Sequence, residues 1–261
     1  MRKIITPDGT AIAVQCSGTG TPLLLVHGTN GDHTRWDAVR PHLAEHFCVY
    51  AMDRRGRGES NDGLDYSIEA EYADIAAVAQ SIEGPLDILG HSFGAACVLG
   101  AAPRIQNLRR LILYEPPMLH TQHSPERSAV LDQMDQELQK GNPEEVVLLM
   151  LRKILFTPEA LIERMRLHPA WAAQLPGAHT IPRELRESSA YGENLDAYRS
   201  IAAPTLFLTG SESPTHFRAT TDILVGIMPH SQVVVLPGQQ HSAMLTAPAL
   251  FAQQVIQFLG Q

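Results

Sequence analysis

Short apolar runs that alternate with helical patterns constrain the fold of this chain more than any other feature. After residue 18, turn residues bound each run, and segments with apolar residues at helical spacing, such as Ile68 to Ile82, separate the runs. This alternation is typical of an α/β protein with a mostly parallel sheet and helices on both faces. The predicted strands are Leu23 to Val26, Phe47 to Met52, Leu86 to Leu89, Leu108 to Tyr114, Thr205 to Leu208 and Val233 to Leu236.

The first 18 residues follow a different pattern. The segments Arg2 to Ile5 and Ala11 to Cys16 flank Pro7-Asp8-Gly9, and the glycine of this turn permits a positive φ. We therefore expect an N-terminal hairpin.

The alternation stops between Pro116 and about Arg199, where no convincing strand occurs between two strands that should be sheet neighbours. Ser124-Pro125-Glu126, Asn142-Pro143-Glu144 and Thr157-Pro158-Glu159 each place a capping side chain before a proline and an acid, which is typical of a helix start. We therefore predict a helical cap insertion at residues 116–199 and a core made of residues 1–115 and 200–261.

A candidate nucleophile lies where a predicted strand turns into a helix. The motif Gly90-His91-Ser92-Phe93-Gly94 follows Leu86 to Leu89 and precedes an apolar helical run. Such a turn strains the serine, exposes its hydroxyl above the sheet and sets it at a positive helix end. Ser92 is therefore the predicted nucleophile.

The general base for Ser92 is predicted to be His241. This histidine lies in a loop near the C-terminal end of the chain, after Val233 to Leu236, from which its imidazole can reach Ser92. Two carboxylates remain candidates for the orienting acid. Glu115 ends the strand Leu108 to Tyr114 beside the nucleophile strand, and we prefer it; Glu212, in the loop after Thr205 to Leu208, is the alternative.

Two backbone N–H groups should form the oxyanion hole. One is predicted from Phe93, after the nucleophile, and the other from Thr29, in the loop after Leu23 to Val26. The segment from Asp53 to Ser60 is glycine-rich but lacks the ending of a phosphate loop, so we interpret it as a structural turn with exposed or paired charges. The sequence suggests no cofactor and no metal site.

Composition limits the partners of the chain. The formal net charge is −8 and the basic residues are scattered, which argues against nucleic acid. No apolar run approaches the roughly 18 residues of a membrane span, and no export signal is visible, so we expect a cytoplasmic protein. Cys16, Cys48 and Cys97 are expected to be reduced and buried. The oligomeric state cannot be derived from the sequence.

Taken together, these motifs resemble those of the α/β-hydrolase superfamily. The His27-Gly28 loop, the turn from Asp53 to Ser60, the serine motif and the segment from Pro237 to His241 occur in the order of that family. The resemblance implies an eight-stranded sheet, a cap after the sixth strand and Ser–acid–His catalysis without a cofactor. Ser213 occupies the family's usual aspartate position.

Members that carry their acid after the sixth strand, such as mycotoxin lactonases and some haloalkane dehalogenases, are similar around Tyr114-Glu115-Pro116. A dehalogenase would need an aspartate in place of Ser92, which excludes that reaction.

The leading hypothesis is hydrolysis of a carboxylic ester or lactone of a small, apolar molecule. A thioesterase, a carbon–carbon bond hydrolase, a cofactor-free perhydrolase and a small-molecule sensor with a vestigial triad stay open, because one fold serves them all. Candidates for substrate contact are His27, Met118, Met150, Phe156, Trp171, His179 and Tyr191.

Overall fold

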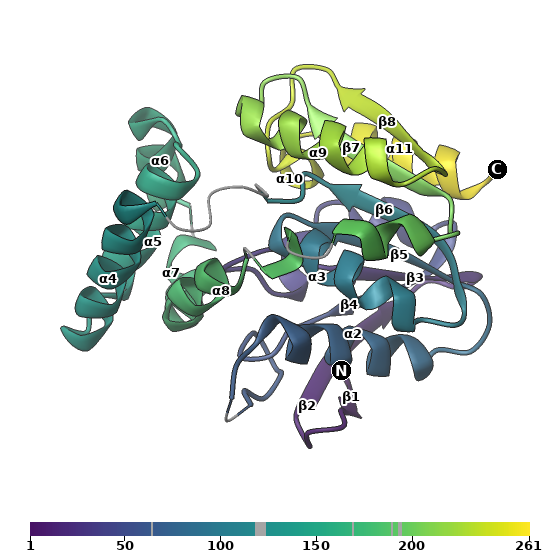
Figure 1. Ribbon diagram of the computed structural model, residues 1–261, viewed down its shortest axis with the longest axis horizontal. Helices are drawn as coiled ribbons and strands as arrows, with labels where there is room; N and C mark the ends of the chain where they lie inside the picture. Colours follow the sequence, from purple (N-terminus) through teal and green to yellow (C-terminus); the bar gives the residue numbers. More distant parts are fainter. Residues whose placement is uncertain (64, 118–123, 169, 189, 193–194) are drawn as a thin grey trace.

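An eight-stranded sheet runs through the centre of the structure, a computed structural model that describes residues 1–63, 65–117, 124–168, 170–188, 190–192 and 195–261 (Figure 1). Its strands are β1 (Arg2–Ile5), β2 (Ala11–Ser17), β3 (Thr21–Val26), β4 (Phe47–Met52), β5 (Leu86–His91), β6 (Leu108–Tyr114), β7 (Thr205–Gly210) and β8 (Ser231–Leu236). The spatial order is β1-β2-β4-β3-β5-β6-β7-β8. β1 and β2 form the expected hairpin, β2 runs antiparallel to β4, and the remaining pairs are parallel. The predicted mostly parallel sheet is confirmed.

Helices cover both faces of this sheet because successive strand residues point to opposite sides. Leu24 of β3 packs into a buried cluster with α2, α3 and α9, whereas its neighbours Leu23 and Leu25 pack into a second cluster with α1 and α11. These five helices, with three shorter ones (α10, η1 and η2), are α1 (Arg40–Ala44), α2 (Ile68–Gln80), α3 (Phe93–Ala101), α9 (Thr215–Ile227), α10 (Ala243–Thr246), α11 (Pro248–Leu259), η1 (His33–Trp36) and η2 (Ala102–Arg104). The central parallel strands β3, β5, β6 and β7 are thus largely buried on both sides, whereas the edge strand β8 is only partly buried.

The described residues between β6 and β7 form helices and no strand. They are α4 (Pro125–Gln139), α5 (Pro143–Leu149), α6 (Glu159–Arg166), α7 (Ala170–Gln174), α8 (Ile181–Glu187), η3 (Met150–Ile154), η4 (Leu175–Thr180), η5 (Ala190–Gly192) and η6 (Leu195–Ser200). Figure 1 shows α4, α5 and α6 grouped to one side of the sheet. We call α4 to α8, with η3 and η4, the inserted helices.

The inserted helices have their own apolar cluster, which includes Met134 and Ile162. Tyr191 of η5 and Tyr198 of η6 pack instead with α2 and α3 of the main core. The packing therefore changes from one cluster to the other before residue 199, and the predicted division into core and cap stays a prediction.

The three predicted helix starts differ in detail. Ser124 caps α4, since its side chain accepts a hydrogen bond from the N–H of Arg127. Asn142 precedes α5 without capping it and donates its amide to Glu137. The prediction at Thr157 is wrong by one position, because α6 begins at Glu159 with Pro158 as its flanking residue.

Two further expectations concern the environment of the chain. No helix of the described residues combines the length and the apolar character that crossing a bilayer requires. The cytoplasmic location stays a prediction. Cys97 is buried as expected, but Cys48 is only half-buried and Cys16 is exposed, because alternate side chains turn outward at the start of β4 and at the end of β2.

Candidate active site

Ser92 occupies the sharp turn between β5 and α3. Its backbone has φ 54° and ψ −125°, a left-handed conformation that is rare for a residue with a side chain. Close packing explains the flanking glycines: a Cβ on Gly94 would lie 2.3 Å from the carbonyl oxygen of His27, and one on Gly90 would lie 2.7 Å from the Cα of Ala95. The neighbouring backbone therefore leaves no room for side chains on either side of Ser92.

Glu115 and His241 meet at the same end of the sheet. Nδ1 of His241 lies 2.6 Å from Oε2 of Glu115, and the other carboxylate oxygen accepts a hydrogen bond of 2.7 Å from the N–H of Gly210. Glu115 is fully buried, which by itself would raise its pKa, but the hydrogen bonds from His241 and Gly210 outweigh burial and hold the pKa below its ordinary value. Glu115 is thus an ionised acceptor for the imidazole N–H.

Tyr114 fixes the loop that carries His241. Its hydroxyl donates to the carbonyl oxygen of Gln240 and accepts from the N–H of Ala243 at 3.1 Å. The phenol is fully buried, and burial raises its pKa well above the usual range, so it keeps its proton. Tyr114 therefore clamps the backbone on both sides of His241.

Two aromatic rings enclose the imidazole of His241. Phe217 stacks on it with ring centroids 4.2 Å apart and an interplanar angle of 15°. His91 lies on another side, and its Nε2 is 2.8 Å from the carbonyl oxygen of His241. Burial, with the charge of His241, holds the pKa of His91 well below its usual value, so His91 is neutral and donates this bond from Nε2. The contacts together restrict the orientation of the His241 ring.

The alternative acid, Glu212, lies away from His241. Its side chain is exposed, its N–H donates to the carbonyl oxygen of Gln239 and its carboxylate accepts from Ser211. Ser213, which occupies the usual aspartate position, places a buried hydroxyl nearby. The structure therefore brings Glu115, and not Glu212, to the imidazole.

The two predicted oxyanion donors line one cavity together with Ser92. Phe93 is the first residue of α3, so its N–H has no acceptor within the helix, and Thr29 is half-buried in the loop after β3. Arg54 holds this loop, since its guanidinium donates to the carbonyl oxygens of His27 and Gly28 at 3.0 and 3.1 Å. The loop carbonyls are thus turned toward Arg54.

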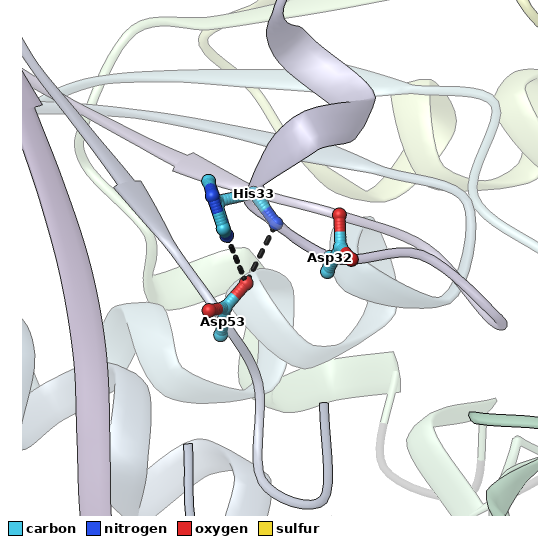
Figure 2. Close-up of side chains that lie close together, drawn as sticks. All are labelled: Asp32, His33 and Asp53. Carbon is cyan, nitrogen blue, oxygen red and sulfur yellow. Dashed lines mark hydrogen bonds and ion pairs between the residues drawn. The ribbon is translucent and has the colours of Figure 1, made fainter. Parts of the chain in front are cut away.

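The far end of the same loop is held by Asp53. Figure 2 shows one oxygen of this carboxylate bonded to both the backbone N–H and the ring Nδ1 of His33, at 2.7 and 2.8 Å. The other oxygen accepts from the N–H of Glu59. Asp32, His33 and Asp53 are close enough to suggest a metal site, but Asp53 is already used in these bonds and Asp32 caps η1 through Thr34. The group is explained as a loop anchor.

Behind the loop, the turn after β4 carries a buried charge network. Arg54 pairs with Glu71 of α2 at 2.8 Å and with Glu184 of α8 at 2.9 Å, and Arg57 also binds Glu184, at 2.7 Å. Burial raises the pKa of Glu71 to about 7, and the charges of Glu184 and Glu71 raise the pKa of Arg54 well above its usual range despite burial. The turn predicted to carry exposed or paired charges carries both: its arginines are paired, and Glu59 is exposed. Arg54 and Arg57 link this turn to an inserted helix.

The cavity above Ser92 has a volume of about 410 Å³ and is bounded by the core on one side and the inserted helices on the other. Thr29, Ser92, Phe93 and His241 line it. Among the candidates for substrate contact, Met150 and Phe156 line it as well.

The other candidates lie elsewhere. His27 is fully buried under the loop and bonded to Gly28 and Arg54, because its ring supports the backbone. Trp171 packs in the apolar cluster of the inserted helices, and His179 faces solvent near Asp62. Tyr191 is buried in the main core. Met118 lies outside the described residues.

Sequence reasoning did not assign several residues that the structure brings to this site. Phe217 stacks on His241, although its position in α9 gives no sign of this. Arg35 and Arg127 line the cavity. Arg35 follows the predicted oxyanion loop closely in sequence, and this proximity could have indicated that it lies at the site. No feature of the sequence around Arg127 indicates its position there.

Comparison with known proteins gives one family. A model described as "Alpha/beta hydrolase family" matches residues 23–254. Among curated proteins, the chain is 32% identical over 149 residues to an uncharacterized hydrolase, YraK, of Bacillus subtilis, covering 55% of each chain. It is 36% identical over 118 residues to the 2-hydroxy-6-oxo-2,4-heptadienoate hydrolase of Pseudomonas putida, covering 42% of this chain and 43% of that one. The chain therefore spans about half the length of the curated relatives it matches.

Solved structures match over nearly the whole chain. An α/β hydrolase from Sphaerobacter thermophilus is 30% identical, with a TM-score of 0.88 and coverage of 99% of this chain and 100% of that one. A thermophilic esterase from Thermogutta terrifontis is 25% identical, with a TM-score of 0.75 and coverage of 99% and 97%.

Proposed function

Because the chain belongs to the alpha/beta hydrolase family, we propose that it is a serine hydrolase that cleaves a carboxylic ester or lactone of a small molecule. The observation that carries the proposal is the contact of 2.6 Å between His241 and Glu115, with His241 and Ser92 lining one cavity. A buried carboxylate on Nδ1 leaves Nε2 of the imidazole to act on the serine.

The first half of the reaction transfers the acyl group to Ser92. Nε2 of His241 takes the hydroxyl proton while Oγ forms a bond to the carbonyl carbon, and Glu115 stabilises the resulting imidazolium. The N–H groups of Phe93 and Thr29 bind the oxyanion of the tetrahedral intermediate. When this intermediate collapses, the bond to the leaving oxygen breaks and His241 returns the proton to that oxygen.

The second half releases the acid. Water loses a proton to Nε2 of His241 and attacks the acyl carbon, and the collapse of the second intermediate breaks the bond to Oγ of Ser92. The proton returns to Ser92 and restores the resting enzyme. The inserted helices serve as a cap that closes the cavity over the substrate, with apolar contacts from Met150 and Phe156.

Labelling with a fluorophosphonate tests this proposal. We expect the wild type to be labelled at Ser92 and to hydrolyse p-nitrophenyl esters, and Ser92→Ala to lose both. Ser242→Ala is the matched control, because Ser242 is another serine that lines the cavity, and it should keep the label. An unlabelled Ser92, with no loss of ester hydrolysis in Ser92→Ala, would show that the proposal is wrong.

Carbon–carbon bond hydrolysis is a second candidate, favoured by the similarity to the 2-hydroxy-6-oxo-2,4-heptadienoate hydrolase. Turnover of that dienoate faster than of any p-nitrophenyl ester or lactone would favour it. Thioesters and peracid formation, tested in the same screen, address the two remaining enzyme alternatives. A protein that binds these compounds but takes no label at Ser92 would be a sensor.

A further inference from the structure

Arg35 is a cation in the wall of the cavity that has no counter-ion among the residues that the structure describes. It belongs to η1, just after the oxyanion loop, and it lines the cavity together with Thr29 and Ser92. Within the described parts of the chain, no hydrogen bond or ion pair reaches its guanidinium. The buried Arg54, by contrast, is held by two carboxylates.

The surroundings of Arg35 make an unpaired charge costly. The side chain is only partly exposed, and burial lowers its pKa, although the charge of Asp32 raises it in part. No ion pair joins Asp32 to Arg35 among the described residues, because Asp32 is directed at Thr34, to which it is bonded twice. An arginine does not lose its proton in a protein, so the site keeps a positive charge that an anion can satisfy.

A second arginine faces the same cavity from the inserted helices. Among the described residues, the guanidinium of Arg127 of α4 donates to two neutral acceptors, the carbonyl oxygen of Leu185 and the hydroxyl of Ser188, and burial lowers its pKa. Among the described residues that line the cavity, the single carboxylate is that of Glu126, which is exposed. The interior of the cavity is thus positive although the whole chain has a formal net charge of −8.

We infer that the substrate carries a carboxylate in addition to the bond that is cleaved, and that Arg35 binds this carboxylate. The inference rests on the proposed function for its orientation toward Ser92. A guanidinium offers a planar pair of donors that matches a carboxylate, and such charged hydrogen bonds are stronger than neutral ones. The sequence suggested an apolar substrate. With a carboxylate bound at Arg35, the substrate is instead an apolar molecule with an acidic end.

Matched pairs of esters test the inference on both sides of the scissile bond. On the acyl side, p-nitrophenyl hemiglutarate is compared with p-nitrophenyl valerate; on the alcohol side, 4-acetoxybenzoate is compared with its methyl ester. The carboxylate preference is the ratio of kcat/KM within a pair, divided by the ratio of spontaneous hydrolysis rates. We expect a preference of at least about tenfold in one pair. No preference in either pair overturns the inference.

Substitutions assign the preference to a residue. Arg35→Gln should reduce it by about 10- to 100-fold, and Arg35→Lys should reduce it less. Arg40→Gln is the matched control, because this substitution also removes one arginine charge near the cavity. Arg40 is paired with Asp37 and does not line the cavity, so the carboxylate preference should stay. The assignment to Arg35 is overturned if the carboxylate preference falls in Arg127→Gln but not in Arg35→Gln. It is also overturned if Arg35→Gln lowers kcat/KM equally for both esters of a pair.

Binding without turnover separates this inference from the proposed function. Glutarate is titrated calorimetrically into Ser92→Ala and into the double variant Ser92→Ala, Arg35→Gln, and we expect at least about tenfold weaker binding in the second. Glutarate binding that depends on Arg35 in a protein whose Ser92 takes no fluorophosphonate would keep the inference and refute the hydrolase. If Ser92 of the wild type is labelled but both variants bind glutarate equally, the hydrolase proposal stands and the inference about Arg35 is refuted.

Discussion

His241 and Glu115 form a hydrogen bond of 2.6 Å although they lie 126 positions apart in the chain. Glu115 directly follows β6, with φ 47°, and this left-handed backbone lets its side chain leave the direction of the strand. Its N–H bonds to Leu208 of β7 while its carboxylate accepts from Gly210, so the acid is held by the neighbouring strand. The orientation of the imidazole is thereby tied to the sheet.

The first prediction concerns this acid. Glu115→Gln should lower kcat by about 10³- to 10⁴-fold, because an amide cannot stabilise the imidazolium that forms during proton transfer. Glu212→Gln, the matched change in the exposed loop, should change kcat by less than about twofold. Steady-state kinetics on one ester decides between them, and the reverse order of effects would identify Glu212 as the acid.

Tyr114→Phe should affect catalysis through the His241 loop. The N–H of Ala243 would lose its acceptor, which costs about 1–3 kcal/mol in the free energy of unfolding, and a displaced imidazole should lower kcat by about 10- to 100-fold. Tyr198→Phe also removes a buried hydroxyl, but one that bonds to Tyr191 in the main core, so it should cost stability without lowering kcat. Urea unfolding and kcat, measured on both variants, check this; equal kcat losses would contradict it.

Two glycines should respond in opposite ways to alanine. Gly94→Ala forces a Cβ against the backbone oxygens of His27 and Val26, at 2.3 and 2.6 Å, so it should destabilise the fold by about 1–3 kcal/mol or more and lower kcat/KM at least about 100-fold. Gly226→Ala, at an exposed position of α9 with no atom within 4 Å of the new Cβ, should stabilise the protein by about 0.5–1 kcal/mol. Thermal unfolding of both variants tests the pair, and a stable, active Gly94→Ala would argue against the tight turn.

Glu71 should make stability depend on pH. Its pKa is 4.5 in the unfolded chain and about 7 in the fold, so between these values the folded protein keeps a proton that the unfolded chain releases. Stability should therefore fall as the pH rises from 4.5 to 7, by up to about 3 kcal/mol, with no contribution from this group to the slope below 4.5 or well above 7.

The check is urea unfolding between pH 4.5 and 8. Glu71→Gln should remove this decrease, because the glutamine has no proton to release. Glu69→Gln is the control on the same helix: Glu69 is exposed and pairs with Arg104 at the surface, so the slope should remain. Identical slopes in the wild type and Glu71→Gln would show that Glu71 is ionised in the fold.

Local pattern was sufficient for most of the fold and for part of the site. The apolar runs located β3 to β8 within two residues of their observed ends, because strands near the centre of such a sheet are mostly apolar. The glycines around Ser92 indicated a turn that only small residues permit. The ends of helices were less accurate: at Thr157 the capping pattern is present, but the helix begins later, since several backbone conformations satisfy one Ser/Thr-Pro-Glu segment.

What the sequence by itself determined is the class of sheet, the place of Ser92 and the candidates for its partners, because these depend on residue type and short-range spacing. Only the tertiary structure decided that Glu115 and not Glu212 reaches His241, that Phe217 stacks on that ring, and that Arg54 joins the loop after β3 to α8. It also placed Arg35 in the cavity with no carboxylate of the described residues paired to it. These outcomes depend on distances between distant segments, which the packing of strands and inserted helices sets and which no local pattern encodes.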